Sequence, residues 1–132
     1  MTPILFVGES EPTAAAAEQT EERLERGLAE VDLGRRPVLV VYEPEWAIGA
    51  DAPAAAEHVR TIVARLKQRL RQRGAQRPAV IYGGTVTADN VGQFTAIGSL
   101  DGVGATRGTL DPRGFATIVA HVARADRRGR GG

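Results

Sequence analysis

The segment Val38-Leu39-Val40-Val41-Tyr42-Glu43-Pro44 decides the fold. Its first five residues favour β-structure and the acid and proline that follow end the run, so it predicts a short strand with a carboxylate at its carboxyl end. Similar apolar runs stand on either side, at Ile4–Val7 and Ala79–Tyr82, with a weaker one near Leu100–Ala105. Continuous apolar runs are typical of parallel strands covered on both faces. We therefore expect four parallel strands.

Helical patterns alternate with these strands. We expect helices over about residues 13–31 and 88–94, and a last one in which Asp111 is the N-cap and Pro112 the first helical residue. The alternation predicts an α/β fold of four βα units, with one domain over residues 1–126 and a disordered tail over 127–132. The best-defined helix has apolar residues at steps of three, four and seven: Val59, Ile62, Val63, Leu66 and Leu70.

Composition narrows the function classes. The 132 residues are 42% hydrophobic and 25% charged, as in ordinary globular domains, and no apolar run is long enough to span a bilayer. The lack of cysteine excludes disulfides, a thiol nucleophile and zinc sites that use cysteine. A net charge of +1 predicts no attraction to nucleic acid or membranes, and the arginine-rich run from Arg65 to Arg77 is expected to be a solvated helix face. The opening residues do not resemble a signal peptide, so a cytoplasmic location is expected.

Polar or glycine-containing segments follow all four strands: Gly8–Ser10, Glu43–Pro44, Gly83–Thr85 and Thr106–Gly108. The carboxyl ends of parallel strands lie at one edge of the sheet, and ligands bind there in barrels and in open sheets alike. These four segments are therefore expected to surround a common ligand site.

Three features of these segments point to chemistry, each with a structural alternative. Glu43 follows a buried strand, where partial desolvation makes a carboxylate a stronger base; the alternative is a loop cap or an arginine pair. The run Gly83–Thr85 before a helix is a candidate anion cradle, or simply a tight turn. Arg107 offers a bidentate contact to phosphate, or is solvated. His58 and His121 fall inside helical patterns, so neither is expected to be catalytic, and no spacing resembles a metal site.

The run Tyr42-Glu43-Pro44-Glu45-Trp46-Ala47-Ile48-Gly49 closely resembles the signature of the triosephosphate isomerases. Residues 3–9, 81–86 and 100–112 are similar to the family's fifth, seventh and eighth strand regions, in the same order and spacing. The resemblance implies the C-terminal half of a TIM (β/α)8 barrel. It also implies an aldose–ketose isomerase that interconverts glyceraldehyde 3-phosphate and dihydroxyacetone phosphate through an enediolate, with no cofactor and no metal.

The resemblance assigns roles by position. Glu43 is implied to be the base that moves the carbon-bound proton, and Tyr82 to help hold a lid closed. The lid and its first hinge are implied to comprise Pro44, Glu45, Trp46, Ala47 and Ile48. The phosphate contacts are implied to be Gly49, Gly83, Gly84, Thr85 and Arg107.

Two departures from the family pattern keep the substrate open. Gly49 is followed by residues 50–53, Ala-Asp-Ala-Pro, where the family usually has Thr-Gly-Lys-Thr, and the family's paired glycines fall at Thr106 and Arg107. Both resemble relatives that isomerise erythrulose phosphate, the alternative substrate.

A whole barrel of this type needs about 250 residues, and the family's catalytic lysine and histidine belong to its first half. We therefore expect the chain alone to be inactive, and to self-associate as a homo-oligomer or to pair with an N-terminal half barrel. The alternatives are a non-catalytic phosphate-binding half barrel and, disfavoured by the match around Glu43, an unrelated regulatory α/β domain.

Overall fold

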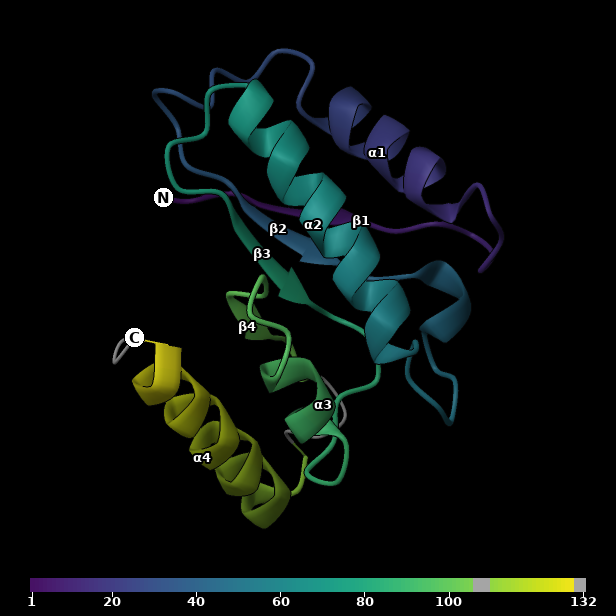
Figure 1. Cartoon of the computed structure of the whole chain (residues 1–132), viewed down its shortest axis with the longest axis vertical. Coiled ribbons are helices and arrows are strands. Elements are labelled where there is room, and N and C mark those ends of the chain that lie inside the picture. Colours follow the sequence, from purple (N-terminus) through teal and green to yellow (C-terminus); the bar gives the residue numbers. More distant parts are fainter. Residues whose placement is uncertain (106–109, 130–132) are drawn as a thin grey trace.

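Four parallel strands form one sheet, and the helices connect them (Figure 1). The structure, a computed structural model, describes residues 1–105 and 110–129. The strand order β1-β2-β3-β4 follows the chain, so the architecture is that of half a TIM barrel, as predicted. The elements are β1 (Ile4–Val7), α1 (Ala16–Gly27), β2 (Leu39–Tyr42), the 3-10 helix η1 (Glu45–Ala47), α2 (Ala56–Gln72), β3 (Ala79–Tyr82), α3 (Val91–Thr95), β4 (Gly102–Val103) and α4 (Pro112–Gly129).

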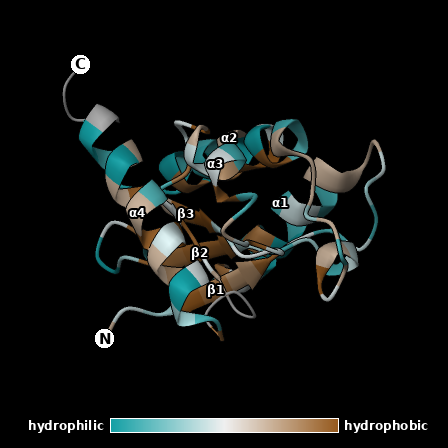
Figure 2. Cartoon of the chain, turned by 90° about the horizontal axis from the view of Figure 1, so that it is seen from below, coloured by the Kyte–Doolittle hydropathy of each residue, from teal (hydrophilic) through white to brown (hydrophobic). Residues whose placement is uncertain are grey.

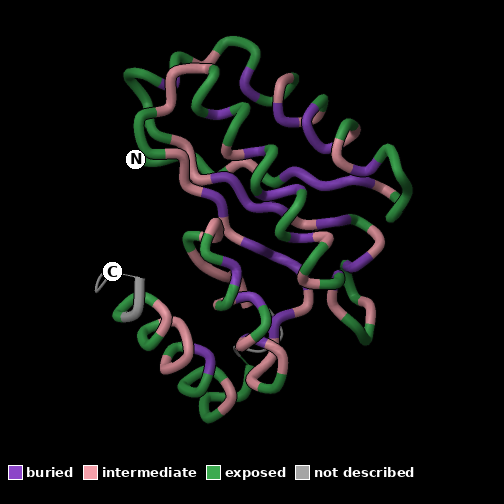
Figure 3. The backbone as a smooth tube through the Cα atoms, in the orientation of Figure 1, coloured by how far each residue is buried: buried purple, intermediate pink, exposed green. Residues whose placement is uncertain are grey.

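The two faces of the sheet have different surroundings. On one face, Val40 and Val80 are fully buried in the core formed with α1 and α2. Figure 2 shows the hydrophobic strands with α1, α2 and α3 on one side of them, and Figure 3 shows burial concentrated along β2, β3 and the inner faces of α1 and α2. On the opposite face, Ile4 and Phe6 of β1 are 56% and 60% exposed. We call this second face, with Ile4, Phe6, Leu39, Val41 and Ile81, the open face.

Helix α2 fits its prediction best, because all five residues of the expected apolar stripe are buried. Helix α1 is shorter than the expected 13–31. The amide of Ala16 donates to the carbonyl of Thr13, so residues 13–15 form a turn, and the chain leaves helical geometry at Leu28. The alanine-rich residues favour helix and so made its start appear too early, whereas Gly27, a residue type that commonly ends helices, was overlooked as the stop.

Strand β4 is shorter than the expected 100–105 because a side chain takes over part of its pairing. The Asp101 amide already donates to the Val80 carbonyl at 3.0 Å, but the Val80 amide donates to the Asp101 carboxylate at 2.7 Å instead of to a backbone carbonyl, so the regular ladder begins at Gly102. Helix α4 begins at Pro112 as predicted and includes residues 127–129, which the sequence assigned to a tail; residues 130–132 lie outside the described residues. None of the described helices is long and apolar enough to cross a bilayer.

The arginine-rich run was expected to be a solvated face; Arg65 and Arg69, each 47% exposed, agree with this, whereas Arg73 is only 25% exposed. Arg65 and Arg69 lie 2.6 and 3.6 Å from the Glu21 carboxylate on α1. Arg73 pairs with Glu25 at 2.8 Å. These ion pairs join α1 to α2, so the local basic charge is used within the fold.

Candidate functional site

Glu43 directly follows β2 and is partly buried. Side chains alternate across a strand, so Glu43 belongs to the open face with Leu39 and Val41, while Tyr42 points to the helices and is fully buried. The Glu43 amide donates to the Val7 carbonyl at 2.8 Å, which fixes its backbone against β1.

A pocket of about 380 Å³ lies beside Glu43. Its walls come from the segment after β2 and from the segment after β3, which sequence reasoning expected at one edge of the sheet. The lining residues are Glu43, Ala47, Ile48, Gly49, Ala50, Asp51, Gly83, Gly84, Thr85, Val86 and Thr87. The structure therefore brings Glu43 together with most of the residues expected to contact phosphate and with part of the expected lid.

The two glycines at this pocket are required by close packing. A Cβ at Gly83 would lie 2.4 Å from Val41 Cγ1, and one at Gly84 would lie 2.1 Å from the Tyr82 hydroxyl. The same lack of side chains leaves the backbone open to a ligand. The helix expected over about residues 88–94 covers Val91–Thr95, so its N-terminus lies further from this loop than expected.

Thr85 and Tyr82 both bind the segment 47–54, which runs from the expected lid toward α2. The Thr85 hydroxyl is within hydrogen-bond distance of the carbonyls of Ala47 (3.3 Å) and Ala50 (3.2 Å). The Tyr82 hydroxyl accepts a bond from the Ala54 amide at 3.0 Å. The segment 47–54 is thus bound at Ala47, Ala50 and Ala54 to residues at and after the end of β3. This geometry suits the lid-holding role expected for Tyr82.

The first residues of the expected lid are attached to the loop after β1. Pro44 is buried and leads into η1. Glu45 accepts hydrogen bonds from Ser10 and from Arg23, and these bonds hold the pKa of the Glu45 carboxyl below its usual value. The Trp46 indole donates to the Glu9 carboxylate at 2.9 Å. The side chains of Glu45 and Trp46 therefore both attach the first hinge to the loop after β1 through polar contacts.

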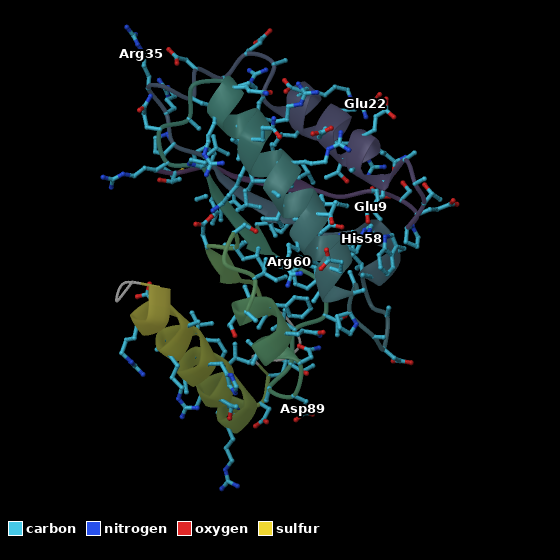
Figure 4. All side chains as sticks on the ribbon, in the orientation of Figure 1. Glu9, Glu22, Arg35, His58, Arg60 and Asp89 are labelled. Atoms are coloured by element: carbon cyan, nitrogen blue, oxygen red, sulfur yellow. The ribbon has the colours of Figure 1, made fainter. Side chains whose placement is uncertain are left out.

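Sequence reasoning missed Glu9. Its carboxylate is fully buried and accepts hydrogen bonds from Thr20 (3.0 Å), Tyr42 (3.0 Å) and Trp46, and His58 Nε2 lies 2.8 Å from it. Figure 4 shows Glu9 and His58 next to each other. Burial alone would raise the pKa of Glu9, but the bonds from His58, Trp46 and Thr20 outweigh it and lower the pKa. Burial and the Glu9 charge raise the pKa of Tyr42.

The Glu9 partners come from α1, β2, η1 and α2, so no short motif contains them. The one available signal was an acid two residues after a strand, one position further along its unit than Glu43. The Tyr42 side chain reaches Glu9 on the helix side of the sheet, whereas Glu43 faces the open side. Glu9 therefore supports the hinge from the face opposite the pocket.

Two features bear on anion binding. Asp51 lines the pocket, so a second carboxylate stands near the segment expected to bind phosphate. Arg107, the cation expected to contact phosphate, lies outside the described residues. Within the described part of the chain, no group of three His, Asp or Glu side chains is arranged to hold a metal ion.

This geometry agrees with comparisons to known proteins. The sequence model of the triosephosphate isomerase family matches residues 1–122. The chain belongs to the triosephosphate isomerase family. The triosephosphate isomerase of Synechococcus sp. (strain JA-3-3Ab) is 36% identical over 128 residues, covering 90% of this chain and 46% of that protein. The one from Delftia acidovorans (strain DSM 14801 / SPH-1) is 36% identical over 126 residues, covering 91% and 50%.

A third triosephosphate isomerase, from Synechococcus sp. (strain JA-2-3B'a(2-13)), is 37% identical over 129 residues, which cover 95% of this chain and 49% of that protein. The chain thus spans about half the length of the curated triosephosphate isomerases that it matches.

Proposed function

We propose that this chain supplies the general base and the phosphate loop of a triosephosphate isomerase. The observation that carries the proposal is the shared pocket of about 380 Å³, which Glu43 borders together with Gly83, Gly84 and Thr85. A carboxylate and a glycine-containing loop lie at one opening, as the binding of a phosphorylated ketose requires. The segment 47–51 borders the same pocket and is proposed to act as the lid.

In the proposed reaction, Glu43 takes a proton from the hydroxymethyl carbon of dihydroxyacetone phosphate. The electron pair of the broken C–H bond forms the carbon–carbon double bond of the enediolate, and the carbonyl pair moves onto its oxygen. The proton then returns to the neighbouring carbon while the hydroxyl proton passes from the first oxygen to the second, which gives glyceraldehyde 3-phosphate. A glutamate base, a neutral histidine that polarises the carbonyl, and lid closure that excludes water are the family's known mechanism. We propose that the histidine and a lysine come from a first-half barrel, because no such pair borders Glu43 in the described pocket.

We propose that the first-half barrel is also the physical partner. Strands β1 and β4 are the two edges of the sheet, and Ile4 and Phe6 of the open face are largely exposed. Unpaired edges and exposed apolar side chains favour association. A second copy of this chain is the competing partner. A cytoplasmic location stays a prediction.

The test combines the chain with the first-half barrel of the Synechococcus sp. (strain JA-3-3Ab) triosephosphate isomerase and measures conversion of glyceraldehyde 3-phosphate. Isomerisation is expected with the mixture and not with either half, and Glu43→Gln should lower kcat by about 10²–10⁴, the usual contribution of a general base. Glu22→Gln, on the exposed side of α1, is the matched control and should leave kcat unchanged. An active mixture in which Glu43→Gln has no effect would overturn the assignment.

The tetrulose alternative is favoured by the sequence departures after Gly49 and at Arg107. The same mixture should be assayed with erythrulose phosphate, and a larger kcat/KM for this substrate would select the alternative. Binding of phosphoglycolate without turnover of either substrate would instead favour a non-catalytic phosphate-binding half barrel.

A further inference from the structure

Arg23 on α1 joins the loop after β1 to the first hinge of the expected lid. Its Nη1 donates to the Gly8 carbonyl at 2.5 Å and to the Glu45 carboxylate, and its Nη2 donates to the Ser10 hydroxyl at 2.8 Å. The Ser10 hydroxyl donates in turn to the other Glu45 oxygen at 2.8 Å. Guanidinium, hydroxyl and carboxylate therefore form a closed ring, the Arg23 clamp, made of Gly8, Ser10, Arg23 and Glu45.

The Arg23 clamp lies directly against the backbone of Glu43. The site of a Cβ on Gly8 is 2.0 Å from the Glu43 carbonyl oxygen, so these two backbone segments are in direct contact. The Glu43 amide donates to Val7 and the Glu45 amide donates to Glu9, at 2.8 and 2.9 Å. The segment 43–45 thus lies on the segment 7–9, and Arg23 binds one group from each.

The clamp also borders the space on the far side of Glu43. A second pocket, of about 470 Å³, is lined by Phe6, Val7, Gly8, Arg23, Arg26, Glu43, Glu45 and Ile48. Glu43 lines both this pocket and the one next to Gly83–Thr85. A hinge that shifted on this side would move Glu43 relative to the phosphate loop.

Because the Arg23 clamp is partly exposed to solvent, we expect it to affect the geometry of the hinge more than the stability of the fold. The side chain of Arg23 is 27% exposed and that of Glu45 is 52% exposed. Ion pairs at such positions add little to folding stability, because water and salt screen them. A charge-assisted ring can nevertheless select one orientation of the groups that it joins.

We propose that Arg23 is a positioning residue that anchors the first hinge through Glu45, so that the lid moves while the backbone of Glu43 stays fixed. The inference rests on the proposed function of Glu43 as the base. The anchoring itself is a property of the folded chain, so it is measurable without turnover.

Trp46 is the only tryptophan of the chain and follows Glu45 directly, so its fluorescence reports on the hinge. Arg23→Gln should raise the acrylamide quenching constant of Trp46 by roughly twofold, the population change expected when an exposed ion pair is lost. Arg35→Gln, which removes an exposed ion pair with Asp32 and lies outside this pocket, is the matched control and should leave quenching unchanged. Should Arg23→Gln fail to fold, Glu45→Gln removes the same ion pair and should give the same rise.

With the first-half barrel supplied, Arg23→Gln should lower kcat about tenfold and leave KM within about twofold, because a displaced base slows the chemistry more than substrate binding. The double variant R23E/E45R should recover part of both effects. Unchanged quenching in Arg23→Gln, or an equal rise in Arg35→Gln, overturns the anchoring. If the mixture is inactive but quenching responds as expected, the isomerase proposal fails and the anchoring stands.

Discussion

Gly8→Ala tests the contact between the loop after β1 and the backbone that carries Glu43. A Cβ at residue 8 would lie 2.0 Å from the Glu43 carbonyl oxygen, 2.5 Å from its carbonyl carbon and 2.9 Å from Pro44 Cα. All three atoms belong to the backbone, so no side-chain rotation relieves the overlap. Gly8 does not have a positive φ angle, so the expected effect comes from the contact and not from backbone strain.

The magnitude follows from the distances. Ordinary contacts begin at 3.4 Å, so the segments 7–9 and 43–45 must move apart by about 1 Å. Overpacking of a well-packed region costs about 1–3 kcal/mol, and an overlap with backbone on both sides belongs at the upper end. For a domain of this size, about 3 kcal/mol lowers Tm by roughly 10 °C. A displacement of about 1 Å in the base should also lower kcat/KM about a hundredfold in the reconstituted mixture.

Thermal unfolding followed by circular dichroism measures the first effect, and the isomerase assay measures the second. Gly98→Ala is the matched control, because no atom lies within 4 Å of the Cβ position there and its φ is not positive. A Gly8→Ala variant whose Tm stays within about 2 °C of the wild type would refute the packing argument, because overpacking has a measurable cost.

Two further outcomes are expected. Glu9→Gln should lower the free energy of unfolding by about 1–3 kcal/mol, because a buried network loses its charged acceptor. The folded pKa of Glu9 is lowered, so the stability that the ionised carboxylate contributes is present above the unfolded value of 4.5 and is lost as pH falls through the folded pKa. Urea melts below that pH should therefore show a smaller loss of stability in the variant than in the wild type. Tyr82→Phe removes the acceptor of the Ala54 amide and should cost about 1 kcal/mol in urea melts, with faster exchange of that amide by NMR; an equally protected amide would contradict the contact.

The sequence predicted the features that rest on local periodicity. Strands β1 and β3 and the buried stripe of α2 have the expected bounds and residues, because unbroken apolar runs and a helical repeat leave little choice. Glu43 and the loop Gly83–Thr85 were expected at one pocket because parallel strands end at the same edge.

Features that depend on long-range contacts were not predictable in the same way. The buried Glu9 accepts bonds from residues 11, 33 and 37 positions away, and Arg23 reaches Glu45 across 22 positions. Neither arrangement produces a periodic pattern or a short motif in the sequence. The start of β4 was placed too early for a similar reason, because the Asp101 side chain replaces a backbone partner of Val80.

The alternation of Tyr42 and Glu43 across β2 limits how this strand can change during evolution. Tyr42 joins the Glu9 network on one side of the sheet, and Glu43 borders the pocket on the other. Deleting or inserting a single residue between Leu39 and Tyr42 would exchange the two sides, placing a carboxylate among the packed helices and a phenol at the pocket. A change of length by one codon would therefore abolish both arrangements at once.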